Sequence, residues 1–205
     1  MSTNVTRRVF LANAAAASAS LVFAFRLPLR TNSGAETDSK SFAPNAFLEI
    51  ASNGNVTIWC AKSEVGQGVR TSLPMIVAEE LGCDWRRVTV AQADLDPKYG
   101  DQLTGGSLSV RTSYADLRKA GAAAREILLT AGAKQWNILP SECRVENGSV
   151  LHSPTARRIA FEKLIFAASA LTPLADPPLK KSSDFMFVGK FTCCTDMKLK
   201  IIGVV

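Results

Sequence analysis

The sequence predicts an α/β (α+β) fold. Short segments with alternating apolar residues are joined at two Asn-Gly pairs, which are typical of β-hairpins. Longer segments carry the composition and the end signals of α-helices. The chain has 205 residues, of which 47% are hydrophobic and 20% charged, so it can bury a core and is neither disordered nor a coiled coil.

The expected hairpins turn at Asn53-Gly54 and at Asn147-Gly148, because Asn and Gly adopt the left-handed backbone that such turns need. In chain order, the expected elements are strands over residues 46–50 and 56–60, a helix from about 71 to 81, a strand over 88–91, a helix from about 113 to 136, strands over 143–146 and 150–152, and a short helix from about 161 to 170.

The expected helix ends rest on particular residues. Thr71 or Ser72 is the expected N-cap of the first helix, with Pro74 in its first turn and Gly82 at its C-terminal cap. Asn137 marks the end of the long helix, shortly before a proline. A polar loop between residues 94 and 111 precedes that helix, and loops of this length are usually functional or disordered.

The first thirty residues are predicted to be a twin-arginine export signal. Arg7 and Arg8 stand directly before an apolar run from Val9 to Phe25. The run is too short and too diluted for a membrane-spanning helix, which favours a cleaved leader over an anchor. We therefore expect a periplasmic protein, or one on the membrane facing the periplasm, with residues 31–45 as a linker to the domain.

The charge of the chain does not indicate nucleic-acid binding. The formal net charge is +6, but four arginines lie in the first thirty residues. From residue 31 onward, 20 basic residues stand against 18 acidic ones and are interspersed with them, which predicts no nucleic-acid partner.

Cysteine and histidine usage excludes several kinds of site. The five cysteines include no C-x-x-C pair, and Cys60 lies in an apolar alternation typical of a core residue. His152 is the only histidine and is expected at the surface, so neither a His-based metal site nor a Ser-His-Asp triad is predicted. We assign no metal ligand and no catalytic residue.

Two glycine-bearing loops precede the two expected helices and form the candidate site. The first holds Gly66, Gln67 and Gly68. The second leads into the long helix, and its candidate residues are Gly105, Gly106, Ser107, Ser109, Val110, Arg111 and Thr112. Glycines permit close backbone approach, and helix N-termini attract anions, so together the loops predict a large, polar, phosphate-bearing ligand. Neither loop is a Walker A sequence or a full G-x-G-x-x-G, and each could merely turn the chain in a non-catalytic exported binding module.

Several separated motifs, in order, resemble a known family. They are the run from Lys62 to Met75, the Ala78-Glu79-Glu80-Leu81 segment, Leu95 to Gln102, and Thr104 to Ser107. The sequence resembles the large molybdopterin-binding subunit of the xanthine dehydrogenase and aldehyde oxidase family, in the branch of the isoquinoline 1-oxidoreductase beta subunit. Exported aldehyde dehydrogenases and nicotinate hydroxylases belong to the same branch, where twin-arginine leaders are common.

The resemblance implies a cofactor, a reaction and partners. It places Gln67 near the ligand sphere of molybdenum, and the segment from Gly105 to Thr112 around a pyranopterin and its phosphates, with both loops facing a common cavity. The implied cofactor is molybdopterin in its cytosine dinucleotide form, and the implied reaction is hydroxylation of an N-heterocycle or an aldehyde with oxygen from water. Electrons would leave to a two-iron, two-sulfur small subunit, with a cytochrome c as a further candidate acceptor.

The resemblance also implies that much of the family's site lies outside this chain. Members of the branch run several times longer, and their glutamate base lies downstream, while Glu64 is expected only to fix its loop. We therefore expect residues 46–172 to be one portion of a molybdopterin-binding domain and residues 173–205 to be an extended connector and truncated tail. A fragment of this kind is expected to be inactive by itself.

Overall fold

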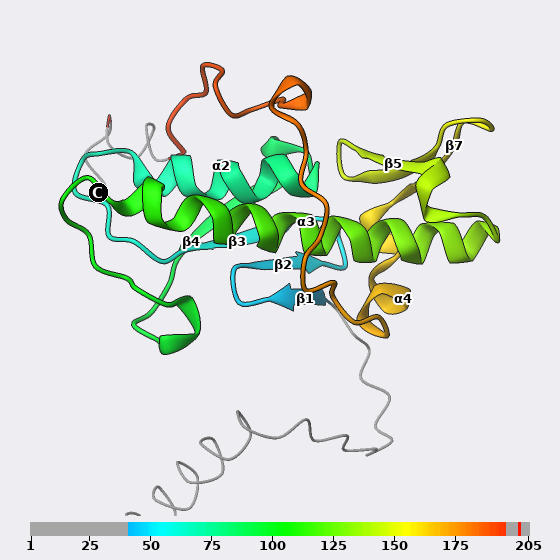
Figure 1. The fold of residues 1–205 in the computed structure, drawn as a ribbon, viewed down its shortest axis with the longest axis horizontal. Helices are drawn as coiled ribbons and strands as arrows, with labels where there is room; N and C mark the ends of the chain where they lie inside the picture. The colour runs from blue at the N-terminus through cyan, green and yellow to red at the C-terminus, as the bar shows by residue number, and fades with distance from the viewer. Residues whose placement is uncertain (1–40, 196–200, 202–205) are drawn as a thin grey trace, which may run out of the picture. The chain divides into compact units, whose positions relative to one another are not determined.

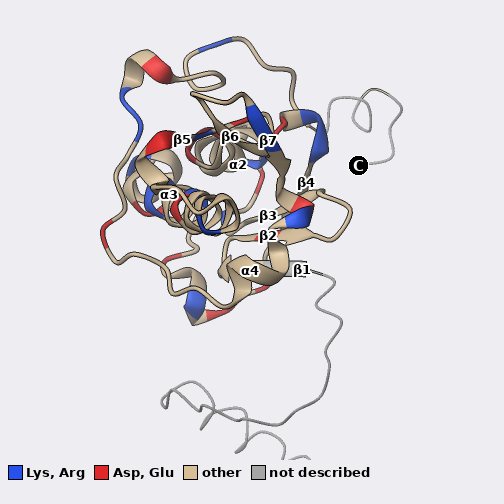
Figure 2. Cartoon of the chain, turned by 90° about the vertical axis from the view of Figure 1, so that its right-hand side faces the viewer, with Lys and Arg blue, Asp and Glu red and all other residues tan. Residues whose placement is uncertain are grey.

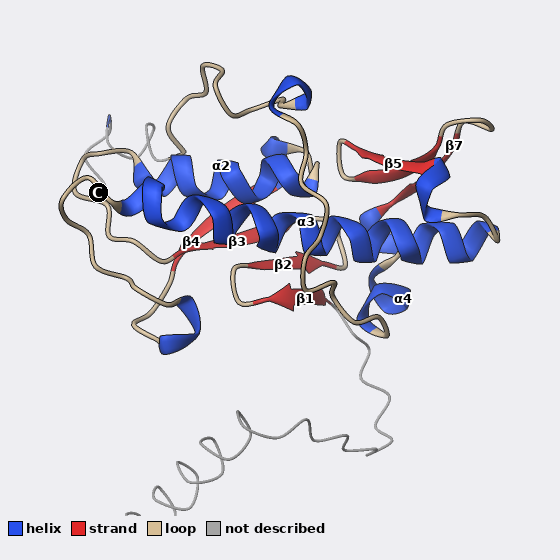
Figure 3. Cartoon of the chain, in the orientation of Figure 1, coloured by secondary structure: helices blue, strands red, loops and turns tan. Residues whose placement is uncertain are grey.

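The computed structural model describes residues 41–195 and residue 201, and it contains two β-sheets and a pair of long helices (Figures 1 and 3). The strands are β1 (Ser41–Asn45), β2 (Leu48–Ala51), β3 (Val56–Cys60), β4 (Val88–Gln92), β5 (Cys143–Glu146), β6 (Ser149–His152) and β7 (Arg157–Ala160), and the helices are α2 (Val69–Leu81), α3 (Ser109–Trp136) and α4 (Ile165–Ser169). The predicted α+β fold is confirmed.

The first sheet has the strand order β1-β2-β3-β4. Its pairs are antiparallel except for β3 and β4, which are parallel and are joined through α2. Along β3, Val56, Ile58 and Cys60 are buried and alternate with less buried residues, so the predicted core position of Cys60 is confirmed. The predicted turn at Asn53-Gly54 joins β2 to β3, with Gly54 at φ 81°.

Helices α2 and α3 pack against each other and lie against the first sheet (Figure 1). Gly121 of α3 makes this close packing possible, because a Cβ at that position would lie 2.4 Å from the carbonyl oxygen of Val77. The far half of α3 contacts the second sheet, whose order is β5-β6-β7. Charged residues of both signs are interspersed along the described chain (Figure 2).

The second sheet contains the predicted hairpin, and this part of the chain differs from expectation in three places. Asn147 and Gly148 turn between β5 and β6 with φ 46° and 71°. Strand β7 was not expected, because its exposed arginines hide any apolar alternation. His152, expected at the surface, is buried, and its Nε2 lies 3.2 Å from the Glu142 carboxylate. The expected helix over 161–170 is a 3₁₀ turn at Phe161–Lys163 followed by the short α4.

Strand β1 is a further correction, because the sequence places residues 41–45 in a linker. The strand pairs antiparallel with β2, and its register is interrupted between Phe42 and Asn45. Pro44 falls in this interruption at the edge of the sheet, where a missing N–H is tolerated. The predicted leader, residues 1–30, and the rest of the linker lie outside the described residues.

Both predicted helix starts are wrong by a few residues. Helix α2 begins at Val69 after Gly68, whose φ is 79°, so Pro74 lies in the helix interior rather than in the first turn. Thr71 does not cap the helix, since its Oγ1 accepts a hydrogen bond from the N–H of Thr195. Helix α3 begins at Ser109 rather than 113, and the Thr112 hydroxyl donates to the Leu108 carbonyl one turn back, as hydroxyls within helices do.

Residues 173–195 run as an extended segment over the helix pair, with a 3₁₀ turn at Ser182–Asp184 (Figure 1). The fully buried Glu79 holds this segment, because its Oε2 accepts hydrogen bonds from the backbone N–H groups of Met186, Phe187 and Val188 at 2.8, 2.6 and 3.1 Å. A buried carboxylate therefore fixes the course of residues 186–188, while the predicted division of the chain at residue 173 stays a prediction.

The neighbouring Glu80 is also fully buried and fully paired. Its carboxylate accepts from Arg118 Nε at 2.7 Å, from Arg125 at 2.9 Å and from the Lys180 N–H at 3.0 Å. Because a buried charge is tolerated only when it is paired, these contacts tie α2, α3 and the extended segment together.

Candidate functional site

The two loops of the candidate site lie at the same end of the helix pair, where both α2 and α3 begin (Figure 1). We call residues 61–68, between β3 and α2, the first loop, and residues 93–108, between β4 and α3, the second loop. The loops are in direct contact, because the Ser63 N–H donates to Thr104 Oγ1 at 2.9 Å. The sequence thus identified two segments that the fold brings together.

Glu64 organises the first loop from inside. Its Oε1 accepts from the N–H groups of Gly66 and Gly68, each at 2.9 Å, and its Oε2 accepts from the Arg70 N–H at 2.9 Å. The predicted role of Glu64 as a loop-fixing acceptor is confirmed. The amides of Gly68 and Arg70 at the start of α2 are not free for an anion, because the carboxylate already accepts from them.

Gln67 is exposed, and its side chain folds back onto its own loop. Its Oε1 accepts from the Val65 N–H at 2.6 Å, and its Nε2 donates to the Ser63 carbonyl oxygen at 2.9 Å. A ligand that used this amide group would have to replace both hydrogen bonds. The assignment of Gly66, Gln67 and Gly68 to a cofactor stays a prediction.

The start of α3 offers what the start of α2 lacks. Among the described residues, no side chain caps α3 at Leu108, and the first turn of α3 contains no acidic residue. The first-turn amides and the positive end of the helix dipole therefore favour an anion, and the exposed Arg111 adds a guanidinium. Ser109 is buried, whereas Val110 and Thr112 are exposed in the same turn.

Gly105 tests whether these residues fit a bound group. Its φ is not positive, and a Cβ there would meet nothing within 4 Å, so no contact of the described chain requires glycine at this position. A bound group that approaches the backbone closely would explain why glycine stands at this position. Gly106 differs, because its φ of 58° already favours glycine, and Ser107 follows with φ 56°. The start of α3 fits a phosphate-bearing ligand.

Lys62 is a site residue that the sequence analysis did not single out. Its side chain is fully buried, and its Nζ donates to the Leu103 carbonyl at 3.0 Å and to Asp101 Oδ2 at 3.3 Å. The Leu103 N–H, and then the Lys62 ammonium, hold the pKa of Asp101 below its ordinary value. The sequence contained a signal for the burial of Lys62. Every second residue of β3 up to Cys60 points inward, and the next residue in this alternation is Lys62.

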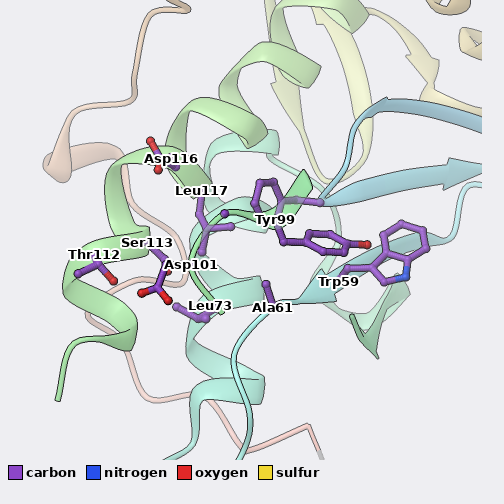
Figure 4. A pocket seen from close by; sticks show the side chains of 11 residues that line it. Trp59, Ala61, Leu73, Tyr99, Asp101, Thr112, Ser113, Asp116 and Leu117 are labelled. Atoms are coloured by element: carbon purple, nitrogen blue, oxygen red, sulfur yellow. The ribbon is translucent and has the colours of Figure 1, made fainter. Parts of the chain in front are cut away.

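A pocket of about 130 Å³ opens beside the second loop (Figure 4). Figure 4 shows the rings of Trp59 and Tyr99 toward one side of it and Asp101, Thr112 and Ser113 toward the other. Of the predicted site residues only Thr112 lines it, so the expected cavity shared by Gln67 and the second loop is not this one and stays a prediction. The lining residues are Phe47, Trp59, Ala61, Leu73, Tyr99, Gly100, Asp101, Thr112, Ser113, Asp116 and Leu117.

The described part of the chain contains neither a cluster of metal ligands nor a membrane-spanning helix. Within it, no three His, Cys, Asp or Glu side chains are grouped so that they could hold a metal ion. Among the helices of residues 41–195, none combines the length and the apolar character needed to cross a membrane.

Residues 16–198 match the family described as the molybdopterin cofactor-binding domain. The chain belongs to this family. Three curated relatives are similar to it. The first is a membrane-bound aldehyde dehydrogenase (pyrroloquinoline-quinone) of Gluconacetobacter polyoxogenes, which is 32% identical over 91% of this chain. The second is the beta subunit of isoquinoline 1-oxidoreductase of Brevundimonas diminuta, 33% identical over 84% of this chain. The third is one subunit of the nicotinate dehydrogenase of Pseudomonas putida, 31% identical over 77% of this chain.

The match confirms the resemblance stated from the sequence, and the relatives include a member of the branch named there. The match with this chain covers only 25%, 23% and 13% of the length of the three relatives, in the same order. The activity, substrates and partners of the longer proteins are therefore not properties that this chain has by similarity alone.

Proposed function

We propose that this chain holds molybdopterin, in its cytosine dinucleotide form, as part of the large subunit of a molybdenum hydroxylase. The whole assembly would oxidise N-heterocycles or aldehydes with oxygen from water. The observation that carries the proposal is the uncapped start of α3, where free helix amides and Arg111 stand beside a glycine that the described fold does not require.

Four residues at the end of the second loop and the start of α3 have roles in this proposal. Gly105 and Gly106 let the backbone approach the pterin and its phosphates, and the Ser107 hydroxyl can donate a hydrogen bond to a phosphate oxygen. Arg111 supplies a positive charge in the first turn of α3, where it adds to the helix dipole. These groups bind and orient the cofactor.

The first loop has a different role, because Glu64 already takes its amides. Glu64 keeps the backbone of Gly66 and Gly68 in a fixed shape, and Gln67 is the side chain that can turn from Ser63 toward a ligand. The bound cofactor would supply the two-electron oxidation of the substrate. We assign no catalytic base to the residues of either loop, and we propose that the chain binds the cofactor and is inactive by itself.

The proposed partners are a two-iron, two-sulfur small subunit and a cytochrome c as electron acceptor. Two of the relatives are named as subunits of their enzymes, which supports an assembly of several chains. We also propose export by the twin-arginine route to the periplasm, on the strength of Arg7, Arg8 and the apolar run behind them.

The competing proposal is an exported, non-catalytic module whose loops only turn the chain. The full chain is expressed together with the enzymes that synthesise the molybdenum cofactor, and the purified protein is analysed for metal and pterin. This experiment separates the two proposals. We expect molybdenum, a fluorescent oxidised pterin and released cytidine monophosphate in equal amounts, without dye-linked oxidation of heterocycles or aldehydes by the chain alone. Protein free of metal and pterin would favour the module, and pyrroloquinoline quinone in place of pterin would contradict the cofactor assignment.

A further inference from the structure

Lys62 is a buried cation whose partners all lie in the second loop. Its side chain is 2% exposed, and burying an ammonium group costs free energy unless it is paired and hydrogen-bonded. Lys62 belongs to the first loop, whereas the two groups that accept hydrogen bonds from its Nζ, Asp101 Oδ2 and the Leu103 carbonyl, belong to the second. The position of the second loop and the burial of Lys62 therefore depend on each other.

Hydrogen bonds join the first loop to residues 101–104 of the second loop. Asp101 accepts from Lys62 with one oxygen, and its other oxygen accepts from the Leu103 N–H at 3.0 Å. Thr104 continues the contact, because its Oγ1 accepts from the Ser63 N–H and lies 3.3 Å from the Ser63 carbonyl. The next residue is Gly105, so the contact ends where the candidate cofactor segment begins.

We propose that Lys62 is a positioning residue whose buried ammonium fixes the second loop against the first, so that both can meet one ligand. The inference rests on the proposed function for the identity of that ligand. The positions of the two loops can be tested without knowing the ligand. If Lys62 served only the stability of the core, its removal would leave the contact between the two loops unchanged.

The test compares Lys62→Met with wild type in the full chain, because methionine keeps the apolar length and removes the charge. The matched control is Lys98→Met, which removes an exposed lysine of the second loop that pairs with Asp96. Hydrogen exchange is measured at the amides of residues 101–108, at those of 63–68 and at the centre of α2.

We expect Lys62→Met to raise exchange about tenfold or more in both loops, while the centre of α2 exchanges at the wild-type rate. The control should match wild type throughout. Unchanged exchange at residues 101–108, or an equal rise in loops and α2, would overturn the inference. If Lys62→Met does not fold, Asp101→Asn replaces it, since this carboxylate is largely exposed, and loop exchange must rise in the same way.

Cofactor content gives the second readout. At equal folded protein, Lys62→Met should hold about tenfold less pterin than wild type, and Lys98→Met should hold the wild-type amount. Wild-type occupancy in Lys62→Met would contradict the positioning role. Wild-type protein without pterin would refute the proposed function, and the exchange experiment would still decide whether Lys62 fixes the loops.

Discussion

Gln67 and Thr104, from different loops, donate hydrogen bonds to the same backbone oxygen. The Gln67 Nε2 lies 2.9 Å and the Thr104 Oγ1 3.3 Å from the carbonyl oxygen of Ser63. The two glycine motifs of the candidate site are therefore joined through a single peptide group. A substitution in either loop should therefore alter the conformation of the other.

Removal of the Glu64 carboxylate should destabilise the first loop. Glu64→Ala leaves three backbone donors without their acceptor, so we expect a loss of about 1–2 kcal/mol in the free energy of unfolding, measured in urea. Glu146→Ala removes an exposed carboxylate paired with Arg144 and should change stability by less than about 0.5 kcal/mol. Equal effects of the two changes would contradict the role given to Glu64.

Two glycine substitutions should separate packing from ligand binding. Gly121→Ala places a methyl group 2.4 Å from a backbone oxygen of α2 and should cost about 1–3 kcal/mol in unfolding free energy. Gly105→Ala meets nothing and should change stability by less than about 0.5 kcal/mol. Its pterin content should nevertheless fall below that of wild type, and normal content would remove the argument that Gly105 faces the cofactor.

Acid should weaken the contact between the loops. The pKa of Asp101 is lowered in the folded protein by the Leu103 N–H and then by Lys62, so this group stabilises the fold above its ordinary pKa. That contribution is lost as the pH falls through the ordinary carboxyl pKa and below it, until the carboxylate is protonated in the folded protein as well. Wild type should therefore lose more stability than Asp101→Asn over this interval, and parallel stability curves for the two proteins would contradict the prediction.

Glu79 should control the extended segment over the helices. Glu79→Gln removes the charge that three consecutive backbone N–H groups share, so limited proteolysis within residues 173–195 should become at least about tenfold faster. Asp184→Asn changes an exposed carboxylate of the same segment and serves as the control. Equal cleavage of both variants and wild type would show that Glu79 does not hold the segment.

Local signals predicted much of the fold. Asn53-Gly54 and Asn147-Gly148 mark turns by their own backbone preference, and Gly82 and Asn137 end their helices with φ 74° and 55°. Strand β1 could not be predicted in this way, because it exists only through pairing with β2 at the sheet edge.

The errors at the site have the same origin. The start of α2 depends on the Glu64 carboxylate, which accepts from the Gly68 N–H at the end of the loop and from the Arg70 N–H in the first turn of the helix, in place of an ordinary cap at Thr71. Lys62 and Glu79 contradict the usual exposure of charged residues, because their partners are distant in the sequence. The glycine motifs were found, but the contacts that join them depend on the fold.

The central claim is that the start of α3 holds the phosphates of molybdopterin, and the pterin content of Arg111→Gln tests it most directly. The control is Arg158→Gln, which changes an exposed arginine of β7 outside both loops. At equal folded protein, the account predicts about tenfold less pterin in Arg111→Gln and wild-type content in the control. Equal pterin in Arg111→Gln and wild type would contradict it.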